Sequence, residues 1–215
     1  MRADIVPGAV FPDYELTDHL GAKRRLSELQ REHPYLRSEM GNPMVLVLGR
    51  GHYCPKDQLQ HRDLVTLYPK MAVAYNQLVT ILPDELGDVQ DFREGVGAPW
   101  TFLSDAGHTI PRDLDIWEYT TLPHQPTIPH TFVLEPGLKI YKVYNGYWFW
   151  GRPSTEELWQ DLRAVSRKVR PDWDLGAPGL RAAWDAGDKR RFYPYEGERW
   201  WQGQGATGDA QGQGG

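Results

Sequence analysis

An apolar run that leads almost directly into a helix start is the feature that most constrains the fold. Met44-Val45-Leu46-Val47-Leu48 has the length and the β-branched content of a strand that is buried on both faces. Residues 49–53 then form a short loop, and Pro55 marks a helix start, because proline is favoured at the first helical position. A buried strand followed by a helix begins a βαβ unit, so the sequence predicts an α/β fold.

The segments around this unit predict a mixed sheet flanked by helices. Strands around Gly21 form an N-terminal β-hairpin, and capping boxes at Ser27 and Ser154 start helices over about 28–33 and 155–169. The helix from Pro55 is expected to end or kink at Pro69. Further strands are expected at 77–82, 100–103, 131–134 and 139–144, with helical segments near 89–94 and 109–117. From residue 44 the order is therefore β-α-β-α, an insertion, then β-β-α.

Charge and cysteine content exclude several classes of protein. The 215 residues carry a formal net charge of −5, which gives no electrostatic case for binding nucleic acid or an anionic membrane. No apolar run approaches the roughly 18 residues of a transmembrane helix, and the N-terminus lacks the apolar region of a signal peptide. One cysteine excludes an internal disulfide and fits a reducing compartment. We therefore expect a soluble cytoplasmic protein.

The tryptophans concentrate in the last third of the chain and bear on its domain organisation. We expect one well-buried domain over residues 1–170, a Trp-rich extension at 171–201 that packs on it, and a disordered Gly/Gln tail at 202–215. The aromatic run at 147–150 has two interpretations. It either lines a groove for an apolar substrate or a protein partner, or it is buried against the extension or in a homodimer contact; burial is favoured because so much aromatic surface is costly to expose. The tryptophans of the extension are Trp173, Trp184, Trp200 and Trp201.

Cys54 is the candidate nucleophile. It immediately precedes the helix start at Pro55, where unpaired backbone N–H groups and the helix dipole favour a thiolate over a thiol. The alternative is an inert buried cysteine, but the position at a strand-to-helix turn favours a reactive one. A thiolate that attacks a peroxide or a disulfide becomes a sulfenic acid or a mixed disulfide. With no second cysteine in the chain, an external thiol must then regenerate it.

Four polar neighbours have both a chemical and a structural interpretation. Arg50 supplies a guanidinium to the reaction or anchors the loop, and His52 acts as a base or second charge or is simply solvated. Asp57 and Gln58 follow Cys54 by three and four residues, so they share its helix face and are placed to hydrogen-bond near the sulfur. Asp57 alternatively complements the helix dipole, which is the favoured interpretation. His61 lies two turns, roughly 10 Å, along the helix and cannot share a metal ion with Cys54.

Four segments in order resemble the peroxiredoxin-like branch of the thioredoxin superfamily, the alkyl hydroperoxide reductase and thiol-specific antioxidant family. The resemblance covers roughly residues 7–168. It implies a thioredoxin-like α/β fold with an N-terminal hairpin and a peroxiredoxin-style insertion. It also implies a thiol oxidoreductase without a cofactor, in which an acid at Asp57 joins the hydrogen bonds near the cysteine. The segments are PGAVFPDYEL at 7–16 with Gly21 and LSEL at 26–29, CPKD at 54–57, WTFLSD at 100–105 and IPHTFVLEPG at 128–137.

The sequence departs from this family at three positions. The proline and threonine that the family places seven and three residues before its reactive cysteine are Val47 and Gly51 here. The family arginine at the start of the strand after the insertion is replaced by Pro129, which resembles the cis-proline of thioredoxins. The resemblance therefore implies a cis Ile128–Pro129 peptide that faces Cys54. The thioredoxin Cys-x-x-Cys pattern is absent.

Two functions of different class follow. The first is a single-cysteine, thiol-dependent oxidoreductase of a peroxide or disulfide substrate, in which Arg50 replaces the missing arginine. The second is a thioredoxin-fold binding or redox-sensing module, with a copper or zinc site at Cys54, His52 and His130 as one form of it. The enzyme is favoured, with no metal or cofactor. Its predicted substrate or partner groove comprises Gly51, Tyr53, Pro129, His130, Trp148 and Trp150.

Overall fold

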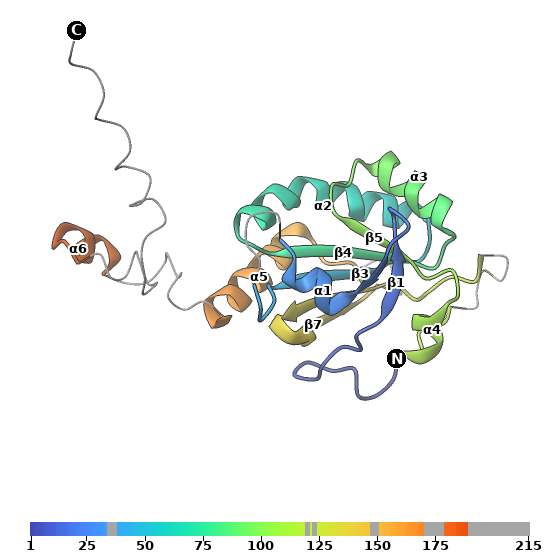
Figure 1. Ribbon diagram of the computed structural model, residues 1–215, viewed down its shortest axis with the longest axis horizontal. Helices are drawn as coiled ribbons and strands as arrows, with labels where there is room; N and C mark the ends of the chain where they lie inside the picture. The colour runs from blue at the N-terminus through green and yellow to red at the C-terminus, as the bar shows by residue number, and fades with distance from the viewer. Residues whose placement is uncertain (34–37, 119–120, 122–123, 147–150, 170–178, 189–215) are drawn as a thin grey trace, which may run out of the picture. The chain divides into compact units, whose positions relative to one another are not determined.

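The computed structural model describes residues 1–33, 38–118, 121, 124–146, 151–169 and 179–188 (Figure 1). The chain divides into two compact units, residues 1–169 and residues 170–215. In the second unit the described part contains helix α6 (Leu180–Asp185). The predicted tail lies entirely outside the described residues and the Trp-rich extension lies mostly outside them, so the packing of the extension stays a prediction.

A seven-stranded mixed sheet with the order β2-β1-β5-β4-β3-β6-β7 forms the centre of the first unit (Figure 1). Strand β3 pairs in parallel with β4 and antiparallel with β6, and β4 pairs in parallel with β5. The N-terminal hairpin joins the edge of β5 through β1. This arrangement confirms the predicted α/β class. The strands are β1 (Glu15–Asp18), β2 (Lys23–Arg25), β3 (Met44–Leu48), β4 (Gln77–Leu82), β5 (Thr101–Ser104), β6 (His130–Glu135) and β7 (Lys139–Asn145).

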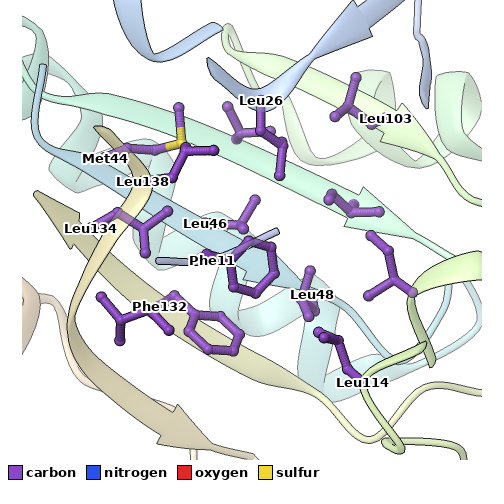
Figure 2. Close-up of a cluster of buried hydrophobic side chains, with 14 of the residues drawn as sticks. Phe11, Leu26, Met44, Leu46, Leu48, Leu103, Leu114, Phe132, Leu134 and Leu138 are labelled. Atoms are coloured by element: carbon purple, nitrogen blue, oxygen red, sulfur yellow. The ribbon is translucent and has the colours of Figure 1, made fainter. Parts of the chain in front are cut away.

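Helices cover both faces of the sheet, and alternate residues of each strand face different cores. Val45 and Val47 of β3 pack with apolar residues of α2, α3 and α5, whereas Leu46 and Leu48 pack on the opposite face. Figure 2 shows this second core, where Phe11 from the N-terminal segment lies against Phe132 of β6. The helices are α1 (Leu26–Arg31), α2 (Pro55–Val73), α3 (Leu86–Val96), α4 (Thr109–Asp113) and α5 (Thr155–Val169), and the 3₁₀ turn η2 (Pro136–Leu138) joins β6 to β7.

The capping prediction is confirmed at one helix and wrong at the other. At α5 the Ser154 N–H and Oγ donate to Glu157, and the Glu157 N–H donates back to Ser154 Oγ. At α1 the N-cap is Arg25, because Ser27 donates both its N–H and its hydroxyl to Asp13. Ser27 therefore fixes the N-terminal segment to α1 instead of starting the helix.

Helix α2 runs through Pro69 to Val73, so it does not end at Pro69, while the alternative of a kink there stays a prediction. Apolar residues on its buried face continue past the proline: Leu64, Leu67 and Met71 all belong to the core between α2 and the sheet. This packing offsets the loss of one backbone hydrogen bond. At 19 residues α2 is long, yet no helix in the described ranges has the length and apolarity needed to cross a membrane.

Candidate active site

Cys54 lies where the sequence predicted it, at the N-cap of α2 and after the carboxyl end of β3. Its side chain is only 2% exposed. Its carbonyl oxygen accepts the N–H groups of Asp57 and Gln58, and its own N–H donates to the Gly51 carbonyl at 3.0 Å. The thiol is thus held at the positive end of a 19-residue helix, the position that stabilises a thiolate.

Asp57 organises the loop that precedes the cysteine. Its fully buried carboxylate accepts the backbone N–H groups of Arg50 at 2.6 Å and Gly51 at 3.1 Å through Oδ2. The other oxygen, Oδ1, accepts a hydrogen bond from Arg152 Nη2. A single carboxylate therefore connects the start of α2, the cysteine loop and the segment before α5. For Gln58 the described contact is its backbone N–H, which belongs to the first turn of the helix.

Arg152 is the residue that the sequence analysis missed. Its Nη2 lies 3.9 Å from Cys54 Sγ, and its Nε donates to Gln60 Oε1 at 3.1 Å. Gln60 in turn donates to Thr131 Oγ1 of β6. These contacts place a guanidinium beside the sulfur, the group that the family places at the position of Pro129. No local pattern could have found Arg152, because 98 residues separate it from Cys54.

The Arg50 guanidinium is held by the insertion between β5 and β6. Its Nε donates to the buried Glu118 at 2.5 Å, and its Nη2 donates to Thr121 Oγ1 at 2.9 Å. The hydrogen bond to Glu118 is the main cause that raises the pKa of Arg50, and a hydrogen bond to Cys54 acts in the same direction. Arg50 is therefore anchored to the insertion between β5 and β6, and its role in the reaction stays a prediction.

Gly51 has a backbone conformation and surroundings that disfavour a side chain. Its φ of +143° is disfavoured for residues with a Cβ, and a Cβ built at this position would lie 2.9 Å from Tyr53 Cε1. The same atom would lie 3.4 Å from Asp84 Oδ1. The tyrosine ring occupies the space that a threonine side chain would need.

His52 and Tyr53 are held by partners outside the loop. Asp84, which follows β4, accepts the His52 backbone N–H and contacts His52 Nδ1, each at 2.8 Å. The ring of Tyr53 stacks on His124 at 3.9 Å between centroids, and the Arg50 guanidinium lies 5.4 Å from its centroid. Burial raises the pKa of Tyr53 to about 12, so it is a neutral phenol at physiological pH. His52 is 41% exposed, so its ring contacts solvent at the edge of the loop.

The expectation of a cis-proline is wrong. No peptide bond in the described part of the chain is cis, so Ile128–Pro129 is trans. The extended backbone continues from Pro129 straight into β6, where His130 pairs with Leu48 at the end of β3. The Pro129 carbonyl accepts the Gly146 N–H at 2.7 Å, and a Cβ on Gly146 would lie 3.0 Å from that oxygen. Pro129 thus contacts Gly146, the residue that directly follows β7.

His130 is buried beside this position and is uncharged. Its Nδ1 donates to the Ile128 carbonyl at 2.8 Å, and burial lowers its pKa. Its Nε2 has no hydrogen-bond partner among the described residues. The alternative of a metal site at His52, Cys54 and His130 fails, because no three His, Cys, Asp or Glu side chains within the described ranges are placed to hold a metal ion. Trp148 and Trp150, the aromatic part of the predicted groove, lie outside the described residues.

Comparisons with known proteins agree with this geometry. The model of the AhpC/TSA family matches residues 7–143. Among solved structures, the peroxidoxin BcpB from Mycobacterium tuberculosis superposes with a TM-score of 0.61 at 23% identity, covering 76% of this chain and 97% of that one. A cysteine-to-serine mutant of PrxQ from Xylella fastidiosa superposes with a TM-score of 0.61 at 14% sequence identity. The match covers 75% of this chain and 97% of that one.

A third structure, described as a putative thiol:disulfide interchange protein DsbE from Chlorobium tepidum, superposes with a TM-score of 0.57 at 20% identity. The match covers 74% of this chain and 97% of that one. These likenesses confirm the thioredoxin-like fold. No curated protein matches the chain.

Proposed function

Because the chain belongs to the AhpC/TSA family, a family of peroxiredoxin-like thiol oxidoreductases, we propose that it reduces a hydroperoxide through Cys54 and uses an external thiol as reductant. The observation that supports this most is the Arg152 guanidinium 3.9 Å from the Cys54 sulfur. A cation at this distance stabilises the attacking thiolate and the negative charge that develops on the leaving oxygen. A reducing compartment such as the cytoplasm, which supplies thiols, is part of the proposal.

The proposed cycle has three steps. The Cys54 thiolate attacks one peroxide oxygen, so that an S–O bond forms while the O–O bond breaks, and the other oxygen leaves as an alcohol or water after taking up a proton. Cys54 is now a sulfenic acid. One external thiol then forms a mixed disulfide with release of water. A second external thiol attacks that disulfide, which restores Cys54 and releases the oxidised reductant.

The other residues of the site act by positioning. Asp57 holds Arg152 and the loop of Arg50 and Gly51 through three hydrogen bonds. Glu118 and Thr121 hold the side chain of Arg50. The two arginines thereby take up the electrostatic role of the family arginine that Pro129 replaces. The family threonine has no substitute at Gly51, so we expect slower oxidation than in proteins that keep it.

Stopped-flow oxidation by hydrogen peroxide tests this function. Wild type should lose its free thiol in a second-order reaction and turn over only when a small thiol such as dithiothreitol is added. Cys54→Ser should neither react with peroxide nor turn it over, while its circular dichroism spectrum and thermal midpoint should match those of wild type. Peroxide turnover by Cys54→Ser equal to that of wild type would refute the proposal.

The second candidate function is a thioredoxin-fold binding or redox-sensing module. Two observations favour it: Cys54 is only 2% exposed, and Gly51 cannot be replaced by the family threonine without a clash. The same experiment separates the two functions. A folded wild type whose thiol persists in excess peroxide supports the module and excludes the peroxidase. If the peroxidase is confirmed, alkyl and aryl hydroperoxides in place of hydrogen peroxide then define the substrate range.

A further inference from the structure

A chain of three hydrogen-bonded side chains reaches from strand β6 to the Cys54 sulfur. Thr131 Oγ1 of β6 accepts a hydrogen bond from Gln60 Nε2 of α2 at 3.1 Å. Gln60 Oε1 accepts one from Arg152 Nε, also at 3.1 Å, and Arg152 Nη2 lies 3.9 Å from Cys54 Sγ. Thr131 and Gln60 are buried and the Arg152 side chain is 13% exposed, so solvent competes little for these hydrogen bonds.

The chemistry of the three groups fixes the direction of the chain. A guanidinium only donates hydrogen bonds, so Gln60 has to present its carbonyl oxygen to Arg152. The amide nitrogen of Gln60 is then directed elsewhere and needs an acceptor, which the Thr131 hydroxyl oxygen supplies. Thr131 pairs with Val47 of β3 on one side and with Tyr144 of β7 on the other, so its backbone is fixed. The hydroxyl thus sets the orientation of the glutamine amide from a rigid strand.

Two anchors fix the plane of the Arg152 guanidinium. Asp57 accepts a hydrogen bond from Nη2, which is the same nitrogen that lies beside the sulfur. One anchor at this nitrogen leaves the planar group free to turn about it. The second anchor, at Nε, removes that freedom, because two contacts on different nitrogens of a rigid fork define its plane. The contact with Gln60 is therefore the one that keeps Nη2 directed at Cys54.

Gln60 holds the arginine without adding a charge. The Arg152 cation already pairs with the fully buried Asp57 carboxylate. A second carboxylate in place of Gln60 would make this cluster net negative and would oppose a thiolate at Cys54. A neutral amide oxygen binds the same guanidinium nitrogen and leaves the attraction between the cation and the sulfur in place.

We propose that Gln60, anchored by Thr131, is the positioning residue that directs Arg152 toward the reacting sulfur. Gln60 acts through the arginine, so it is a positioning residue and not a catalytic one. Its effect on peroxide reduction rests on the proposed function, whereas its effect on the thiol can be measured without peroxide.

Two measurements on variants of Thr131 and Gln60 test this role: the second-order rate of oxidation by hydrogen peroxide, and the pH profile of Cys54 alkylation by iodoacetamide. Thr131→Val keeps the shape of the side chain but removes the acceptor of the glutamine amide. It should slow oxidation about three- to tenfold and move the alkylation midpoint upward. Thr131→Ser keeps the hydroxyl and should recover most of the wild-type rate. Gln60→Glu keeps the acceptor for Arg152 but adds a negative charge, so it should slow oxidation about tenfold and raise the alkylation midpoint by about one pH unit.

The matched control is Thr80→Val, the same change at a buried position of β4 whose hydroxyl contacts His61 and Trp100 instead of this chain. It should keep the wild-type oxidation rate and alkylation profile. Thermal melts identify variants that fail to fold, and if Thr131→Val is one of them, Gln60→Glu decides. A folded Thr131→Val or Gln60→Glu with the wild-type rate and profile overturns the proposal, and so does a Thr131→Ser that is as slow as Thr131→Val.

The alkylation profiles separate this role from the peroxidase itself. If wild type does not react with peroxide, the proposed function fails and the alkylation profiles alone decide. An upward shift of the midpoint in both Thr131→Val and Gln60→Glu supports the role of Gln60 toward the thiol even then. Equal midpoints in wild type and the two folded variants would overturn it.

Discussion

The two ends of the sheet differ in how their polar groups are paired. At the carboxyl end of β3, charged groups are brought together and fully paired: Asp57 with Arg152, and Glu118 with Arg50. At the other end, around Gln77, the ion pair of Glu32 with Arg24 is partly exposed, and the buried amide nitrogen of Gln77 has no partner among the described residues. The first arrangement fixes a reactive group in place through buried, paired charges, whereas the second leaves one buried polar group without a partner.

This difference predicts that the end with the buried ion pairs is the more sensitive to mutation, and Asp57→Asn should have the largest effect on stability. The change removes the negative partner of Arg152, and removal of one partner of a buried ion pair typically costs about 3–5 kcal/mol. Urea unfolding of wild type and variant measures the loss. Gln77→Leu, at the other end, should change the free energy of unfolding much less. Equal losses in the two variants would contradict the comparison.

Arg152 should matter for the reaction as well as for the fold, because its removal also leaves the buried Asp57 carboxylate without its cation. Arg152→Ala removes the cation beside the sulfur, and charge-assisted hydrogen bonds are worth about 1.5–3 kcal/mol, so oxidation should slow roughly 10- to 150-fold. Arg152→Lys keeps a charge but not the fork that joins Cys54, Asp57 and Gln60, and should recover part of the rate. Stopped-flow oxidation by hydrogen peroxide measures the oxidation rates of both Arg152 variants. The exposed Arg163→Ala is the matched control and should react at the wild-type rate.

Gly51→Thr restores the residue type of the family and yet should not restore its chemistry. The new Cβ would lie 2.9 Å from Tyr53 Cε1, and φ would remain at +143°, so we expect a loss of about 1–3 kcal/mol in stability. The double variant Gly51→Thr, Tyr53→Ala removes the obstructing ring. It should oxidise faster than the single variant if the tyrosine is what excludes threonine. Faster oxidation in the single variant than in wild type would show that the loop has more freedom than this geometry allows.

The sequence was sufficient for the parts of this molecule that are encoded locally. Hydrophobic runs and capping residues predicted β4 with its correct bounds and the start of α5, and the strand–loop–helix pattern placed Cys54 at the N-cap of α2. Arg152 and Glu118 were missed because their contacts with the loop join segments far apart in the chain. The cis-proline expectation was wrong for a related reason. It transferred a thioredoxin feature to Pro129, whereas the chain is trans there and continues into β6 at His130.

The effect of Arg50→Ala shows how such a contact changes a prediction. From the sequence, Arg50 is a loop residue that either supplies a guanidinium to the reaction or anchors the loop. In the structure it is an ion-pair partner of Glu118, which is only 5% exposed. We therefore expect Arg50→Ala to lower both the oxidation rate and the thermal midpoint. The sequence contains no local signal for this, because the pair joins residues 68 positions apart.

The smallest expected effect is a pH dependence of stability that arises from two buried histidines on the Cys54 side of the sheet. Burial lowers the pKa of His61 and His130, so the folded state binds fewer protons at these sites than the unfolded state does. Stability then rises with pH in this range: the contribution of each histidine is complete above the unfolded value of about 6.5 and is lost progressively as the pH falls below it. Urea unfolding between pH 7.5 and about pH 5 should show this loss.

His61→Gln distinguishes this cause from a general effect of acid. His61 hydrogen-bonds to the Asp57 carbonyl and to Thr80 Oγ1, and glutamine is a polar residue that does not titrate. The variant should be less stable than wild type at pH 7.5, because it loses the packing of the imidazole on Phe92 and Phe102. The difference in free energy of unfolding between the two proteins should shrink as the pH falls, because only in wild type does protonation of this buried site destabilise the folded state. A constant difference across the whole range would mean that His61 does not contribute to the acid sensitivity, and that the loss arises elsewhere in the fold.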